Sequence, residues 1–141
     1  MGYIAAVKKQ LLDTRNKKYA QIINQSAKDL GYDYCGIAKA QKLDEDAHRL
    51  EKWLNKGYQG KMDYMNKYFD LRIDPTKLVQ GAKSVITLLL NYFPAVRQNT
   101  EAPQVSTYAY GREYHEVIRE KLKLFLLLIK ENIGDVHGRG F

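Results

Sequence analysis

The chain has 141 residues, 45% of them hydrophobic, and carries a formal net charge of +7. This length fits one domain with a real core, and the basic balance suits a polyanionic partner such as nucleic acid. Its single cysteine excludes an internal disulfide and provides too few thiolates for an iron–sulfur cluster or a cysteine zinc site.

The apolar runs of the chain are short. The longest, "VITLLL" and "LFLLLI", fall well below the roughly 20 residues that a membrane-spanning helix needs. The first residues lack the apolar core and the cleavage site of a secretory signal. We therefore expect a cytoplasmic protein.

The first part of the chain predicts two helices with one strand between them. Residues 16–30 place an apolar stripe on one helical face before a glycine stop; the stripe and its stop are Tyr19, Ile22, Ile23, Ala27, Leu30 and Gly31. The segment "YCGIAKA" predicts a short buried strand, in which Cys35 is a structural thiol rather than a nucleophile. Residues 43–55 predict a second helix, which ends at Gly57.

The next region, "GYQGKMDYMNKYFDLRIDPTKL", contains few aliphatic residues. It predicts a lid or loop with short helical turns, one of them capped by Asp74 with Pro75 in its first position. The run "KSVITLLLNYF" then predicts a strand that is buried on both faces and ends at Pro94.

The last part of the chain predicts one more strand and one long helix. After a polar connector, "VSTYAY" predicts the strand, and residues 113–133 predict the helix, with an apolar side from Tyr114 to Ile133. This order of elements predicts an α/β fold, in which a mixed α+β sheet is flanked by helices. The final "GDVHGRGF" leaves the helix toward a strand, so we expect the domain to be incomplete at its C-terminus.

The common catalytic motifs are absent from the sequence. It has no GxxxxGK[ST] motif, no GxGxxG motif after a strand and no HExxH motif. His48, His115 and His137 are scattered, without the spacing of metal ligands. We therefore predict no metal site built from this chain alone.

The stretch "STYAYGREYH" gathers hydroxyls and aromatic rings at the start of the long helix. Gly111 allows a close backbone approach, Arg112 adds charge, and a helix N-terminus favours an anionic group such as phosphate. These features suit a pocket for a flat, polar ligand. The same pattern also fits an ordinary strand-to-helix turn, in which Tyr108 and Tyr110 alternate with core residues and His115 lies on the surface.

Aromatic and basic residues alternate around the loop after the second helix. Such a mixture suits stacking on unpaired bases and pairing with phosphates, and it also suits a lid over a planar cofactor or a satellite core under a long loop. The residues concerned are Trp53, Lys56, Tyr58, Lys61, Tyr64, Lys67, Tyr68 and Arg72. From this pattern we expect Lys61 and Lys67, together with Arg112, to contact RNA.

Three stretches resemble, in order and spacing, the N-terminal domain of epoxyqueuosine reductases: "LNKGYQGKMDYM", "LRIDPTKLVQGAKSVITLLLNYFP" and "STYAYGREYHEVIREKLKLF". The resemblance runs from residue 19 to residue 141, which makes residues 1–18 a variable extension. It implies a fold related to that of corrinoid reductive dehalogenases. It also implies an enzyme that uses cobalamin and four-iron clusters to complete the queuosine modification in a tRNA anticodon.

The resemblance also implies a set of site residues near cobalamin. The matching positions are Arg72, Ser106, Tyr108, Gly111, Tyr114 and His115. The first two match contacts to cobalamin, and the other four match the signature "YAxGxxYH", which lies near the cofactor or supports it. Many members of the family have arginine where this chain has Thr107.

In the family, the proton donor is an aspartate on the strand after the long helix, and a ferredoxin-like domain with cysteine-held clusters follows. We therefore expect both to lie beyond Phe141, so that the chain is inactive alone, and we expect a monomer. Two other functions stay open: a stand-alone RNA-binding domain without catalysis, and a small-molecule oxidoreductase domain of the flavin-reductase type. Cobalamin binding would separate the reductase from the RNA-binding domain, and a steep salt dependence would mark RNA binding.

Overall fold

The computed structural model describes residues 2–141, with side chains from residue 8 onward. The chain forms two compact units. The terminal unit consists of the residues up to Gly36 together with Thr87–Phe141, and the inserted unit is Ile37–Ile86. Among the helices of residues 2–141, none combines the length and the apolar character that a membrane span requires.

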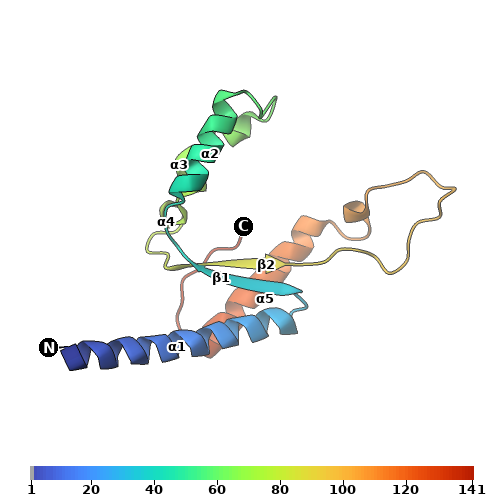
Figure 1. Ribbon diagram of the computed structural model, residues 1–141. Coiled ribbons are helices and arrows are strands. Elements are labelled where there is room, and N and C mark those ends of the chain that lie inside the picture. Colours follow the sequence, from blue (N-terminus) through green and yellow to red (C-terminus); the bar gives the residue numbers. More distant parts are fainter. Residues whose placement is uncertain (1) are drawn as a thin grey trace. The chain divides into compact units, whose positions relative to one another are not determined.

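The terminal unit is built on two long helices that pack against each other, α1 (Gly2–Asp29) and α5 (Tyr114–Ile133) (Figure 1). The side chains buried in this unit are Ser26, Ala27, Tyr32, Phe125 and Ile129. The stripe predicted for residues 16–30 is confirmed, because all five of its apolar side chains are buried or half-buried. The helix is longer than predicted, and residues 8–18 expose every side chain.

The end of α1 is joined to α5 by one lysine. Gly31 adopts the left-handed conformation, with φ +76°, and this confirms the predicted glycine stop. The Lys121 ammonium of α5 donates a hydrogen bond of 2.6 Å to the Leu30 carbonyl, and it lies 5.4 Å from the centre of the Tyr32 ring. One cation therefore satisfies a carbonyl at the end of α1 and contacts an aromatic ring of the core.

The sheet has two antiparallel strands, β1 (Tyr34–Lys39) and β2 (Ser84–Leu89), so both of these predicted strands are confirmed. The predicted burial of β1 is wrong, because Tyr34 and Ile37 are exposed and no residue of the strand is fully buried. At one end of the ladder, within the terminal unit, the Asp33 N–H donates to the Leu89 carbonyl at 2.9 Å. At the other end, within the inserted unit, the Ala40 N–H donates to the Lys83 carbonyl at 3.0 Å.

The prediction that β2 is buried on both faces is wrong. Leu89 is 60% exposed, and Val85 is 37% exposed. The physical reason is that a strand buries both faces only where helices or further strands cover them, and the sheet of the described residues has two strands. Cys35 on β1 is half-buried, and this burial raises the pKa of its thiol, which favours the structural role predicted for it.

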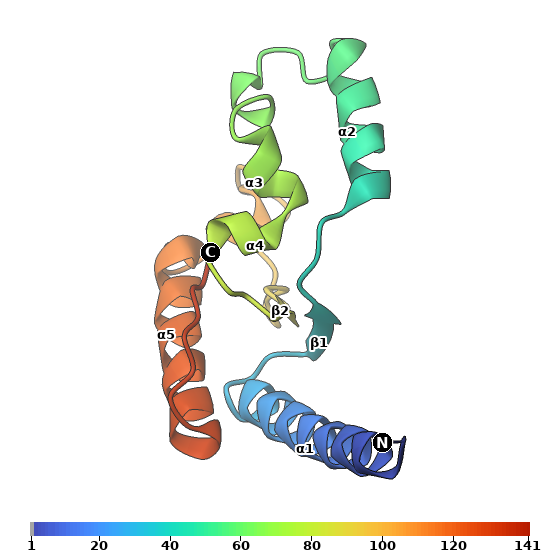
Figure 2. The same ribbon diagram turned by 90° about the vertical axis from the view of Figure 1, so that its left-hand side faces the viewer.

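The inserted unit contains α2 (Asp44–Asn55), α3 (Phe69–Ile73) and α4 (Pro75–Leu78), with a 3₁₀ turn, η1 (Asp63–Met65), between the first two. Helix α3 contacts both α2 and α4 (Figure 2). The short helical turns predicted for this region are thus confirmed.

A small apolar core and one helix cap hold this unit together. Ile73 and Ala40 are the buried apolar side chains, and the Ile73 carbonyl accepts a hydrogen bond of 2.8 Å from the Leu43 N–H. The Asp74 carboxylate caps α4, as predicted: it accepts hydrogen bonds from the N–H and the hydroxyl of Thr76, and these lower the pKa of Asp74.

The strand predicted at "VSTYAY" is wrong. This segment contains a 3₁₀ turn, η2 (Thr107–Ala109), in which the Ala109 N–H donates to the Ser106 carbonyl and the Tyr110 N–H donates to the Thr107 carbonyl. These local bonds occupy the N–H groups that a ladder would need. The alternation of residue types fitted a strand, but a strand also requires a neighbour with which to pair.

The C-terminal segment "GDVHGRGF" also forms no strand. It runs back along α5 in irregular conformation, so the strand expected to begin here is absent from the described residues. Contact with α5 is made at two glycines: a Cβ on Gly138 would lie 3.0 Å from a methyl carbon of Leu126, and one on Gly140 would lie 3.1 Å from a methyl carbon of Leu122.

Candidate functional site

Three aromatic rings form a cluster at the start of α5. The rings of Tyr108 and Tyr114 meet edge to face, with centroids 5.8 Å apart and planes at 86°. The Tyr114 ring also lies against the His115 ring, with centroids 3.9 Å apart. The structure therefore brings together three of the predicted cofactor residues. All three are exposed, Tyr108 at 57% and Tyr114 at 42%, so a ligand can reach the two tyrosine hydroxyls and the imidazole.

The N-terminus of α5 already holds an anionic group from the chain itself. The Glu113 carboxylate accepts hydrogen bonds of 3.1 Å from the N–H groups of His115 and Glu116, and it lies 2.5 Å from Nδ1 of His115. These hydrogen bonds, the one from the His115 N–H above all, lower the pKa of Glu113. Glu113 therefore caps the N–H groups at which a phosphate was expected, and phosphate binding at this helix N-terminus stays a prediction.

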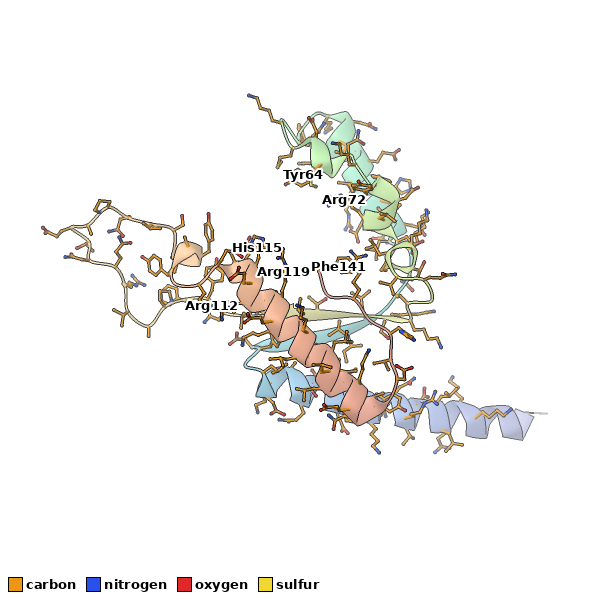
Figure 3. The ribbon with its side chains drawn as sticks, turned by 180° about the vertical axis from the view of Figure 1, so that it is seen from behind. Tyr64, Arg72, Arg112, His115, Arg119 and Phe141 are labelled. Atoms are coloured by element: carbon orange, nitrogen blue, oxygen red, sulfur yellow. The ribbon has the colours of Figure 1, made fainter. Side chains whose placement is uncertain are left out.

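Arg112 is paired within the terminal unit. Its guanidinium donates to both carboxylate oxygens of Glu120, at 2.9 and 3.3 Å, and this raises the pKa of Arg112 and lowers that of Glu120. Both partners are exposed, and exposed ion pairs contribute little to stability. The pair can therefore open to a phosphate, but the charge of Arg112 is already balanced by its partner. Figure 3 shows Arg112 with His115 and Arg119 at this end of α5.

Gly111 and Ser106 flank the aromatic cluster. Gly111 has φ +77°, a conformation that favours glycine, and a Cβ there would meet nothing within 4 Å. Glycine is thus required for the turn rather than for a close approach of protein atoms. Ser106 is exposed and precedes η2. Exposed hydroxyls beside aromatic faces fit the amide-rich rim of a corrin, so this donor set is compatible with cobalamin.

Sequence reasoning missed Gln98, which organises the loop before the cluster. Its side-chain amide donates to the Pro103 carbonyl, and its oxygen accepts from the Val105 N–H and from the Tyr110 hydroxyl at 3.0 Å. An open hollow of about 430 Å³ lies here, lined by Val96, Arg97, Gln98, Val105, Ala109 and Tyr110. No periodic pattern marks a glutamine within a loop, so the sequence held no signal for it.

The other predicted residues lie in the inserted unit. Arg72 donates a hydrogen bond of 3.0 Å to the Tyr64 carbonyl, and its guanidinium carbon lies 5.8 Å from the centre of the Tyr64 ring (Figure 3). Arg72 is thus held by a neighbouring tyrosine while its side chain stays exposed. Lys61 and Lys67 are exposed as well. Within residues 2–141, no three histidine, cysteine or acidic side chains come together in a way that could hold a metal ion.

The family model "Epoxyqueuosine reductase QueG, DUF1730" matches residues 72–141, which include the aromatic cluster and Arg72. The chain is 54% identical over 127 residues to an epoxyqueuosine reductase of Cyclobacterium marinum. Over this region the chain is therefore similar to epoxyqueuosine reductases.

Two further epoxyqueuosine reductases show the same similarity. The chain is 51% identical over 125 residues to that of Leadbetterella byssophila and 35% identical over 128 residues to that of Escherichia coli. These alignments cover 89% of this chain for the Cyclobacterium and Leadbetterella proteins and 86% for the Escherichia protein. The chain spans about 41% of the length of the first two relatives and 34% of the third. No solved structure matches the chain.

Proposed function

We propose that this chain supplies the N-terminal domain of an epoxyqueuosine reductase, which reduces epoxyqueuosine to queuosine in the anticodon of a tRNA. The observation that supports this most strongly is the 54% identity to a relative of that name over 127 residues. We further propose that the enzyme acts in the cytoplasm as a monomer. A stand-alone RNA-binding domain without catalysis is the weaker alternative, because the relatives are named as reductases.

In this proposal the enzyme uses cobalamin as its cofactor, and residues of this domain help to bind it. When bound, cobalamin supplies the electrons that open the epoxide. The exposed cluster of Tyr108, Tyr114 and His115 would offer aromatic faces and polar tips to the corrin and its amides, with Ser106 beside it. The family resemblance assigns a further cofactor contact to Arg72, whose guanidinium is held by Tyr64 and remains exposed.

The remaining parts of the reaction would come from residues outside this chain. One cysteine cannot hold a four-iron cluster, so the electron path of the proposed enzyme requires other residues. The family resemblance likewise assigns the proton donor to none of the residues of this chain. The role of this chain is accordingly to bind and orient the cofactor and the RNA.

The cofactor part of the proposal is tested by replacing Arg72. Arg72→Ala should weaken cobalamin binding by roughly tenfold, because a hydrogen bond from a charged donor is lost. Binding is measured by an absorbance titration of the purified chain. The matched control is Arg49→Ala, which removes an exposed arginine of α2 that is paired with Glu45 and Asp46. Equal affinity of Arg72→Ala and the unaltered chain would remove Arg72 from the cofactor site.

A further inference from the structure

Residues 56–72 of the inserted unit, here called the tyrosine segment, leave three tyrosine rings on the surface. Tyr58 is 61% exposed, Tyr64 is 56% exposed and Tyr68 is 73% exposed. The core of this unit is formed by Ala40 and Ile73, so these rings contribute little to it. Single exposed apolar groups are normal, but several on one short segment mark an interaction surface.

Tyr68 is also held in an unfavourable backbone conformation. Its φ of 59° and ψ of 31° lie in the left-handed region, and among residues 2–141 it is the one residue other than glycine with a positive φ. The conformation is fixed because the N–H groups of Leu71 and Arg72 donate to the Tyr68 carbonyl and start α3 from it. Glycine or asparagine would adopt this conformation more easily. A strained tyrosine whose ring is not buried suggests that the ring is kept for a partner.

Cations flank these rings. The Lys56 ammonium lies 5.5 Å from the centre of the Tyr58 ring, and the Arg72 guanidinium lies 5.8 Å from that of Tyr64. Lys61 and Lys67 are exposed on the same segment. Its two carboxylates, Asp63 and Asp70, are fewer than its four cations, and the second lies 3.6 Å from the Lys77 ammonium. The segment therefore combines aromatic faces with an excess of positive charge.

Unpaired nucleic acid is the partner that fits this combination. Aromatic side chains stack on the faces of unpaired bases, and lysines pair with the phosphates that join those bases. A duplex offers phosphates but hides the faces of its bases. We infer that Tyr58, Tyr64 and Tyr68 stack on unpaired bases of an RNA loop, while Lys61 and Lys67 contact its phosphates. This inference rests on the proposed function, which makes a tRNA anticodon loop the partner.

The test measures RNA binding by the whole chain. The probe is a fluorescent RNA hairpin with an unpaired loop, and binding is followed by anisotropy over a range of salt concentrations. Tyr58→Leu, Tyr64→Leu and Tyr68→Leu should each weaken binding by about tenfold, because stacking on one base is lost. The salt slope should stay unchanged. The corresponding Phe variants should bind like the unaltered chain, since they keep the ring.

Two controls separate stacking from charge and from misfolding. Tyr34→Leu removes a tyrosine that is 65% exposed on β1, outside the segment, and should leave binding unchanged. Replacing Lys61 and Lys67 together with Gln should reduce the salt slope by about one to two, because up to two phosphate contacts are lost. Circular dichroism on each variant shows whether the helices are retained.

Several outcomes would overturn the inference. One is that folded Leu variants bind the hairpin like the unaltered chain. Another is that the Leu variants lose affinity equally for a fully paired duplex of the same charge, since a duplex cannot be read by stacking. A third is that the variants lose binding to anionic lipid vesicles instead of RNA. Failure of the proposed function would give a different result: the chain would not bind cobalamin but would still bind the hairpin.

Discussion

Tyr32 in the terminal unit and Tyr68 in the inserted unit are the same residue type in opposite surroundings. The Tyr32 ring is 7% exposed and meets Phe125 edge to face, with centroids 6.1 Å apart. The Tyr68 ring is 73% exposed, and its backbone is in the left-handed region. One ring joins two helices, whereas the other remains on the surface at some cost in backbone conformation.

The difference follows from what surrounds each tyrosine in the sequence. Helices α1 and α5 both carry aliphatic residues at helical spacing, so they form an apolar face that also buries aromatic rings. The tyrosine segment has few aliphatic residues, and burial of apolar area there is correspondingly small. Aromatic content alone therefore does not indicate a core, because the neighbouring aliphatic pattern decides whether the rings are buried.

The largest change in the free energy of unfolding is expected in the terminal unit, where α1 and α5 pack against each other. Phe125→Ala should lower the free energy of unfolding by about 3 kcal/mol, because a ring that is 5% exposed leaves a cavity against Tyr32. Urea unfolding followed by circular dichroism measures the change. The matched variant Tyr64→Ala removes a ring that is 56% exposed and should change the free energy by less than about 0.5 kcal/mol. If Phe125→Ala and Tyr64→Ala lowered the free energy of unfolding equally, the proposed difference between the two units would be wrong.

A smaller effect is expected at the lysine that joins α1 and α5. Lys121→Met should lower the free energy of unfolding by about 1.5 kcal/mol, since the Leu30 carbonyl loses its charged donor. Lys123→Met, two positions along the same helix and exposed, is the control and should be nearly neutral. If both variants unfold at the same urea concentration, the hydrogen bond makes no net contribution.

The smallest change in the free energy of unfolding is expected at Tyr68, and there we expect an increase. Tyr68→Gly should raise the free energy of unfolding by about 0.5–1 kcal/mol, because glycine adopts a positive φ without strain. Thermal and urea unfolding provide the measurement. Tyr58→Gly, at a position without a positive φ, should instead be destabilising. Loss of stability in Tyr68→Gly would mean that the exposed ring contributes to the fold.

The parts of the fold that could be predicted from the sequence are those with local signals. Helical spacing of apolar residues located α1, α2 and α5, although the start of α1 was placed too late. Gly31 and Asp74 marked their turns correctly, because left-handed glycines and aspartate caps depend on only a few neighbouring residues. The family resemblance likewise rested on continuous stretches of sequence, and the comparisons confirmed it.

The structural features that could not be predicted from the sequence depend on contacts between residues that are distant along the chain. The segment "VSTYAY" alternates like a strand, but pairing requires a neighbouring strand that the pattern cannot reveal. The Glu113 cap at the start of α5 was not predicted, because its role depends on the side-chain rotamer. The clustering of Tyr108 with Tyr114 was expected only in outline, because η2 determines how the two rings meet.

The C-terminal segment shows how packing can limit sequence variation where there is no regular structure. Gly138 and Gly140 lie against Leu126 and Leu122, whereas the intervening Arg139 lies over the ring of Phe141, which is 72% exposed. A Cβ at either glycine would require the facing leucine side chain to move by a few tenths of an ångström. We therefore expect substitutions at Gly138 and Gly140 to be constrained by the leucines of α5, although the segment forms no regular structure.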